Sequence, residues 1–422
     1  MGTQASQATF RSYLFFWAGQ LISLFGSSIA GFVIIWWITW ETKSTVFLSI
    51  ASFAGFAPMV LLTPFAGVYA DRWNRKALIG IVDFLQALAT IALILLFWWN
   101  IVSVWHVIGL SVVRAVFGAF HSPAVSALIP LMVPRDKLSR INGLNYLLSS
   151  VMNLIGPLVA AILLEIWRIY EILWIDAGTF IVALLPLLVI AIPSARKKQE
   201  ESKDKPSFRK ELVEGLAFVK SRKGVLALMV LATVLNFLIM PMNTLYPYFI
   251  MVDHLGDASS LAFVVAFFQG GMLAGGLLMS VKKEFKRKMV IMISVLYLQC
   301  IGYAMAAFTP TGAFWFMAIG ALIMGSTFPV GNVLIQTIIQ TIVPVEIFGR
   351  VNSVMISLAN VASPAGMVLS GLMAGLVGTA NLFLACSLAG VLSLTLSWVF
   401  TDIRHLDRIE VRNEEAEYSQ LH

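Results

Sequence analysis

The sequence predicts an all-α membrane protein with twelve transmembrane helices in two pseudo-symmetric six-helix bundles. Hydrophobic residues make up 59% of the 422 residues and charged residues only 12%, against about 25% charged residues in ordinary soluble proteins. Apolar runs longer than about 18 residues, long enough to cross a bilayer as helices, recur from end to end. The segment Val133–Asn142 returns as Val343–Asn352, with its Val-Pro, acid, Arg and Asn all shifted by 210 residues. A duplicated block of this kind indicates two similar helical bundles.

The boundaries of the spans follow from polar breaks between the apolar runs. The predicted spans are 12–38, 46–70, 77–99, 103–131, 139–164, 172–193, 223–251, 259–281, 289–308, 312–341, 351–376 and 380–401. They define an N-terminal bundle (1–193), a linker (194–222), a C-terminal bundle (223–403) and a tail (404–422). The linker carries an amphipathic helix, which we expect either at the membrane surface or as a solvated connection between the bundles.

The distribution of Lys and Arg predicts the orientation. Nearly all basic residues fall in loops on one side of the membrane, and the other side holds only Lys43 and Arg168. By the positive-inside rule both termini are cytoplasmic. The basic residues therefore do not indicate nucleic-acid binding, and we expect a multi-pass monomer in the cell membrane without a cofactor.

The loop between the second and third spans is a candidate conformational gate. It reads Gly67-Val-Tyr-Ala-Asp71-Arg72-Trp-Asn-Arg75-Lys76. Asp71 can interact with a helix N-terminus, and the three basic side chains can pair with acids or lipid phosphates. The alternative is a plain positive-inside loop. Arg140 and Arg350, the arginines of the duplicated segment, are assigned to the same gate.

This loop resembles motif A (G-x-x-x-D-R-x-x-R-K) of the major facilitator superfamily. The chain resembles members of that superfamily over its whole length. Four further elements are similar to the macrolide-efflux branch in particular: Trp17–Gln20, Arg114, Ala119–Pro123 and Met240–Asn243. The resemblance implies the fold predicted above and export of amphipathic drugs. The matching loop of the second half, 282–288, keeps its basic residues but lacks the Asp, so any latch would be asymmetric.

Arg114 is the one Lys or Arg well inside the predicted spans. An arginine at the centre of a span costs about 2.5–3.5 kcal/mol on insertion scales, so it should face a cavity or partners. Its position resembles the motif B arginine, which implies a role in proton coupling. The alternative is a structural arginine bonded to carbonyls and Gln20. His121 lies on the same helical face and is a candidate proton carrier, because histidine titrates near neutral pH.

Two acids within spans are further candidates for proton transfer. Asp83 lies about two turns from the cytoplasmic end of the third span, and it either carries protons or pairs with the basic loop at 72–76. For Asp176, near the external end of the sixth span, we favour a structural role as a helix cap or a partner of Arg168. Spans seven to twelve contain no clear acid, so coupling residues are expected in the N-terminal half.

Gly156-Pro157 in the fifth span resembles motif C of drug–proton antiporters, with Ala160 and Ala161 in place of the final glycines. Close helix packing and a bend at Pro157 are expected, and Ser363-Pro364 predicts a similar bend in the eleventh span. Uncharged polar residues within spans form a candidate cavity lining. They are Gln20, Asn145, Asn153, Asn236, Asn243, Tyr246, Gln269, Asn332, Gln336 and Gln340.

These observations favour a secondary transporter that exports amphipathic compounds in exchange for protons, by rocking of the two bundles about a midplane site. The alternative with the same fold is export or flipping of lipids or siderophore-like metabolites. A membrane enzyme is disfavoured because the sequence contains neither H-E-x-x-H nor G-x-S-x-G. The sequence also contains no P-loop, so an ion gradient is the expected energy source.

Overall fold

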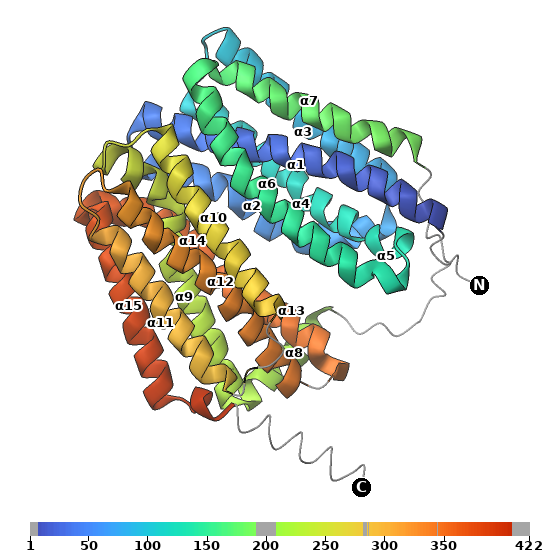
Figure 1. Ribbon diagram of the computed structural model, residues 1–422. Coiled ribbons are helices and arrows are strands. Elements are labelled where there is room, and N and C mark those ends of the chain that lie inside the picture. The colour runs from blue at the N-terminus through green and yellow to red at the C-terminus, as the bar shows by residue number, and fades with distance from the viewer. Residues whose placement is uncertain (1–6, 191–207, 282–284, 286, 344, 407–422) are drawn as a thin grey trace. The chain divides into compact units, whose positions relative to one another are not determined.

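The computed structural model describes residues 7–190, 208–281, 285, 287–343 and 345–406 (Figure 1). All regular elements in this part of the chain are helical, and twelve helices are long and apolar enough to cross a membrane, as the sequence predicts. The chain divides into two compact units, Met1–Lys198 with Ile250–Ala266, and Gln199–Phe249 with Phe267–His422. The predicted linker lies partly outside the described residues and the predicted tail almost entirely.

The helices of the N-terminal half are α1 (Gln7–Thr42), α2 (Thr45–Arg72), α3 (Arg75–Trp98), α4 (Val104–Ser126), α5 (Ile129–Met132), α6 (Leu138–Ile166) and α7 (Ile169–Val189). Those of the C-terminal half are α8 (Phe208–Ser221), α9 (Lys223–Tyr248), α10 (Ala258–Val281), α11 (Lys288–Ala307), α12 (Phe314–Ile342), α13 (Val345–Val361), α14 (Ser363–Val377) and α15 (Thr379–Phe400). A π-helical turn (Phe249–Asp253) extends α9.

The duplication seen in the sequence recurs in the packing. In the first half α1 packs on α6 and α7, and α3 packs on α4 and α7. In the second half α9 packs on α14 and α15, and α11 packs on α12 and α15. These are the same pairs of spans, so the two halves have the same internal architecture.

Glycines allow the closest helix contacts of the second half. A side chain on Gly271 or Gly275 of α10 would meet backbone oxygens of α12, and one on Gly325 of α12 would meet the Phe268 carbonyl of α10. Small residues at such positions let helix backbones approach within a membrane, where packing replaces the hydrophobic effect as the driving force.

Local sequence signals explain several helix boundaries. The Asn74 side chain accepts a hydrogen bond from Ala77 N at the start of α3, and Ser103 accepts one from His106 N at the start of α4. Gly378 alone separates α14 from α15, with a φ of 84° that suits glycine. The short breaks that the predicted spans leave at 100–102 and 377–379 are confirmed.

Two proline positions behave differently from one another. The bend expected at Ser363-Pro364 is a true break, because α13 ends at Val361 and Pro364 stands in the first turn of α14. By contrast, α6 runs without interruption through Pro157.

The prediction of one continuous fourth span over 103–131 is wrong. α4 ends at Ser126 and α5 begins a separate short helix with Pro130 in its first turn, where its missing N–H costs nothing.

The linker helix predicted from its apolar face forms as α8. Only part of that face is covered: Val219 is buried with Val225, Ile403 and Leu406, whereas Val213 is 62% exposed. The exposed part is consistent with either surroundings considered for this helix, so its location at the membrane surface stays a prediction.

Asp257 caps the start of α10 and gives a test of the fold outside the membrane. Its Oδ1 accepts hydrogen bonds from Ser260 N–H (2.8 Å) and Ser260 Oγ–H (2.7 Å). Both bonds lower the pKa of Asp257 below its ordinary value of 3.8, and the bond from the Ser260 side chain has the larger effect. The cap therefore contributes its full stability at pH values above 3.8, and this contribution is lost as the pH falls through the lowered pKa.

We predict that Asp257→Ala lowers the free energy of unfolding by about 1 kcal/mol at pH 7. Ser260→Ala keeps the backbone bond and should cost less. Thermal unfolding of the purified protein at a series of pH values measures both. The difference between wild type and Asp257→Ala should shrink below pH 4, and a difference that stays constant down to pH 2 would contradict this origin.

Candidate functional site

The first polar network in the N-terminal bundle centres on a buried ion pair. Arg114 Nη1 lies 2.8 Å from Asp176 Oδ2, and the two side chains are 15% and 0% exposed. The same carboxylate accepts hydrogen bonds from Ser27 Oγ (2.9 Å) and Thr90 Oγ1 (2.9 Å), and Arg114 donates to Thr90 Oγ1 at 2.8 Å. One acid of α7 is thus joined to α1, α3 and α4.

This pairing corrects two expectations about these residues. Asp176 does not pair with Arg168, whose guanidinium donates to Tyr170 Oη at 3.3 Å. Arg114 is bonded to Asp176 and Thr90 rather than to carbonyls and Gln20. The expectation that Arg114 has partners inside the bundle is correct, and such partners are what make a charge at this depth tolerable.

The second network lies nearer the end of the bundle that carries Arg75. His121 Nε2 of α4 lies 3.1 Å from Asp83 Oδ1 of α3, and Gln20 Nε2 of α1 donates to Asp83 Oδ2 at 3.3 Å. Asp83 is 1% exposed and His121 is 26% exposed. The alternative that Asp83 pairs with the basic loop at 72–76 is therefore wrong. The three residues form an acid–base pair held by an amide.

The two networks occupy the same face of the same three helices, which we call the α1/α3/α4 junction. Gln20 and Ser27, Asp83 and Thr90, and Arg114 and His121 are each seven residues apart. Seven residues are two helical turns, a rise of about 10 Å, and return to the same helical face. The junction therefore holds two stacked layers of polar residues within an otherwise apolar bundle.

Arg114 also borders a cleft of about 400 Å³ between α1, α2 and α4. Its walls are mostly apolar or small, with Ile34, Ile38 and Met59 among them, and Gly118 lies next to Arg114 as its helical spacing predicts. This volume lies in the range of small-molecule sites, which typically combine apolar walls with a few polar groups. The cleft thus offers an apolar surface beside a single ion pair.

Small residues of α1 and its neighbours bring the networks together. A side chain on Gly26 would collide with Thr179 Oγ1 and come within 3.1 Å of the Asp176 Cα atom. A side chain on Gly156 would collide with Ser28 Oγ. The Gly156 of the motif C-like element therefore packs α6 against α1, as predicted, and Gly26 lets α7 approach near enough for the Ser27–Asp176 bond.

The gate residues are placed at the ends of helices. Lys76 Nζ donates to the carbonyl oxygens of Leu188 (3.3 Å) and Ile190 (2.7 Å) at the end of α7, and Arg75 Nη1 donates to Ala127 O (3.4 Å) after α4. Cations are favourable at helix C-termini, where carbonyls lack intrahelical partners. Gly67 lies in α2 and Arg140 is exposed in α6, whereas the side chains of Asp71, Arg72 and Arg350 lie outside the described structure.

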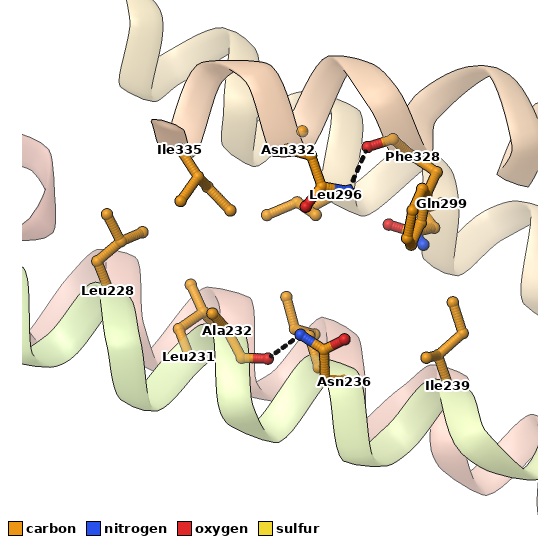
Figure 2. Close-up of a pocket in the computed structure, with 12 residues that line it drawn as sticks. Leu228, Leu231, Ala232, Asn236, Ile239, Leu296, Gln299, Phe328, Asn332 and Ile335 are labelled. Carbon is orange, nitrogen blue, oxygen red and sulfur yellow. Dashed lines mark hydrogen bonds between the residues drawn. The ribbon is translucent and has the colours of Figure 1, made fainter. Parts of the chain in front are cut away.

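In the C-terminal bundle, Asn236 of α9 and Asn332 of α12 point toward one another across a pocket, beside Gln299 of α11 (Figure 2). The remaining candidates for a cavity lining are dispersed. Trp17 Nε1 donates to Asn145 Oδ1 at 3.0 Å, and Gln336 Nε2 donates to Asn352 Oδ1 at 3.5 Å. Tyr246 packs against the Phe383 ring. Asn153, Asn243 and Gln340 are exposed, and Gln269 is half-buried.

Sequence reasoning missed Ser27, Thr90 and Gln299. Serine and threonine are common in apolar helices, where they often bond to the carbonyl one turn earlier, so their presence alone carries little information. The depth of each residue along its helix could have identified the partner of Arg114. Arg114 and Asp176 lie ten and seven residues from the starts of α4 and α7, at similar depth from the same end of the bundle.

A sequence profile of the Major Facilitator Superfamily matches residues 16–311 and 242–419. Macrolide efflux protein A of Streptococcus pyogenes is 30% identical over 396 residues, which cover 94% of this chain and 96% of that protein. The chain belongs to the Major Facilitator Superfamily. The predicted resemblance to macrolide-efflux proteins is confirmed, and the protein is a multi-pass membrane transporter.

Other relatives and solved structures agree with this assignment. Multidrug efflux pump Tap of Mycolicibacterium fortuitum is 27% identical over 395 residues, covering 90% of this chain and 94% of that protein. The fold resembles a bacterial homologue of the human lysosomal transporter Spinster in an inward-facing, unoccupied conformation (TM-score 0.65, 15% identity, 96% of this chain and 98% of that one). It also resembles the nucleoside transporter NupG (TM-score 0.67, 12% identity, 92% and 98%).

The close approach of α1 and α7 predicts a position-specific effect of adding one methyl group to the transporter. Gly26→Ala should lower the free energy of unfolding by about 1–3 kcal/mol, because the new Cβ atom has no room beside Thr179 and Asp176. Gly31→Ala, in the same helix with nothing within 4 Å of its Cβ position, is the matched control. Thermal unfolding in detergent measures both, and equal effects would contradict the close contact.

The ion pair predicts a non-additive pair of substitutions. Asp176→Asn leaves Arg114 charged without its partner and should cost about 3–5 kcal/mol of stability. Adding Arg114→Gln removes that stranded charge, so the double variant should be more stable than Asp176→Asn alone. Thermal unfolding of the two single variants and the double variant measures this coupling. Additive losses would show that the pair contributes nothing as a pair.

Proposed function

We propose that this transporter exports amphipathic drugs, macrolide-like or otherwise lipophilic, by proton antiport with rocker-switch alternating access. The observation that carries the proposal is the pair of stacked acid–base networks in the α1/α3/α4 junction, one of which borders the 400 Å³ cleft. The names of the relatives, macrolide efflux protein A and multidrug efflux pump Tap, support the choice of substrate class. We also propose a monomer in the plasma membrane with both termini cytoplasmic.

Competition between a proton and the substrate would produce the exchange. When Asp176 is ionised, it neutralises Arg114 and the wall of the cleft carries no net charge. Protonation of Asp176 leaves the guanidinium of Arg114 uncompensated, and the cleft then disfavours a lipophilic cation and becomes more costly to cover with apolar surface. Substrate and proton thus favour opposite charge states of one ion pair, which is the condition for antiport.

The Asp83–His121 pair would supply the route to that site. It contains the titratable groups of the second layer, two helical turns closer to the end of the bundle that carries the gate loop. Histidine can accept and release protons near neutral pH, and Gln20 holds Asp83 in place through its hydrogen bond. In this proposal protons pass along the junction, while the drug occupies the apolar cleft.

Transport driven by an imposed pH gradient tests the proposal. A one-unit gradient supplies about 1.36 kcal/mol per proton, so one-to-one electroneutral exchange should concentrate a drug such as erythromycin about tenfold in proteoliposomes. Asp83→Asn and His121→Gln should each abolish this accumulation and leave downhill exchange of the drug. Asp176→Asn mimics the protonated acid beside Arg114, so it should abolish the accumulation and also slow downhill exchange. Glu165→Gln, which alters an exposed acid at the end of α6, is the control.

Unchanged accumulation in all three variants would remove proton coupling from the proposal. Absence of any drug transport by the wild-type protein, with or without a gradient, would remove drug export itself.

A further inference from the structure

The C-terminal bundle contains a small polar pocket that the proposed transport cycle leaves unused. It lies between α9, α11 and α12 and has a volume of about 80 Å³ (Figure 2). Three amide side chains, Asn236, Gln299 and Asn332, are set among leucine, isoleucine and phenylalanine side chains. We call this site the amide pocket.

All three amides have unused hydrogen-bonding capacity, and two of them are held in fixed orientations. Asn236 Nδ2 donates to Ala232 O at 2.9 Å, and Asn332 Nδ2 donates to Phe328 O at 3.0 Å, so each asparagine is oriented by its own helix. Each retains a carbonyl oxygen that can accept a hydrogen bond and a second N–H that can donate one. Among the described residues Gln299 has no hydrogen-bond partner, although it is only half-exposed. The pocket therefore offers three amide oxygens that can accept hydrogen bonds, together with amide N–H groups that can donate them.

The chemistry of the walls restricts the ligand. None of the residues that line the pocket carries a formal charge, so an anionic group would find no cation there. A hydroxyl or amino group can donate to the asparagine oxygens, while the apolar side chains cover the adjoining hydrocarbon. A volume of about 80 Å³ admits one such group or a few waters, and it excludes a whole drug-sized molecule.

The repeat relates this pocket to the charged junction of the first half. With the offset of 210 residues, α9, α11 and α12 correspond to α1, α3 and α4. Asn236, Gln299 and Asn332 correspond to Gly26, Ala89 and Ser122, which are the sequence neighbours of Ser27, Thr90 and His121. The corresponding three helices thus carry buried ion pairs in one half and uncharged amides around a cavity in the other.

A second, smaller cavity of about 30 Å³ continues from the amide pocket. The two share Gln299, Leu235 and Leu296, and the smaller one extends to Cys300 and Tyr303. Gln299 therefore lies at the junction of the two cavities. A ligand whose polar group occupied the amide pocket could place an adjoining apolar group in the smaller cavity. This arrangement suits the end of an amphipathic molecule.

We propose that the amide pocket is a specificity subsite that binds a hydrogen-bond-donating hydroxyl or amino group of the exported amphiphile. The inference rests on the proposed drug export and adds to it a selection for neutral or basic compounds with such donors. Compounds without a hydrogen-bonding group would be bound by the apolar surface alone.

Paired probes distinguish this subsite from general apolar binding. Erythromycin carries hydroxyl and amino groups, whereas tetraphenylphosphonium is a lipophilic cation without a hydrogen-bond donor. The variants Asn236→Leu, Asn332→Leu and Gln299→Met keep side-chain volume and remove hydrogen bonding. Gln299→Met breaks no hydrogen bond within the described structure and is therefore the substitution least able to disturb folding. Asn381→Leu is the control, because Asn381 makes the same type of bond to its own helix outside the pocket.

Equilibrium binding to the purified full-length protein should show erythromycin weakened roughly fivefold in each pocket variant, the effect of one lost hydrogen bond. Tetraphenylphosphonium binding and the Asn381→Leu control should be unchanged. Equal weakening of both probes, no weakening of either, or no binding of erythromycin by the wild type would overturn the subsite. Failure of the transport proposal is a separate result: the binding difference would persist in a protein that shows no transport in proteoliposomes.

Discussion

The structure of the N-terminal bundle depends on the need to satisfy an arginine inside an apolar helix bundle. Arg114 cannot face lipid without a cost of about 2.5–3.5 kcal/mol, and its partner Asp176 would itself be unfavourable if left alone. Together they are stable only if donors fill the remaining positions around the carboxylate, and Ser27 and Thr90 supply them at 2.9 Å each. Four helices are thereby held in one register, and Gly26 is required so that α7 can reach α1.

Most of the fold could be predicted because hydropathy and helix breaks are local properties of a membrane chain. A span has to be apolar over its full length, so its limits are visible in the sequence, and the twelve predicted spans are found, most of them close to their expected limits. Pro364 and Gly378 restrict the backbone by themselves, so the helix breaks at these residues could be predicted from the sequence. The break after Ser126 was missed because Leu128, Ile129 and Leu131 continue the apolar pattern of α4 across it.

The partners of the buried charges could not be predicted in the same way. Each acid had a basic residue nearer along the chain, such as Arg168 for Asp176 and Arg75 for Asp83, and proximity in sequence favoured these. The observed partners lie on other helices, Arg114 and His121, at matching depth within the bundle. Depth, counted in helical turns from one membrane face, was the relevant quantity, because a charge in an apolar interior has to find its partner in its own layer.

The duplicated fold explains why the two halves can carry different chemistry on corresponding helices. Each buried ion pair requires desolvation of two charges and a complete set of surrounding donors, whereas an amide in the same place needs only hydrogen bonds. Repeating the charged layers in the second half would double that cost without adding a further response to protons. The second half instead carries Asn236 and Asn332, which are oriented by their own helices without mutual pairing, and Gln299 beside them. Such groups remain available to a ligand, and the division of roles in our proposals, protons in the first half and substrate recognition in the second, follows from this difference.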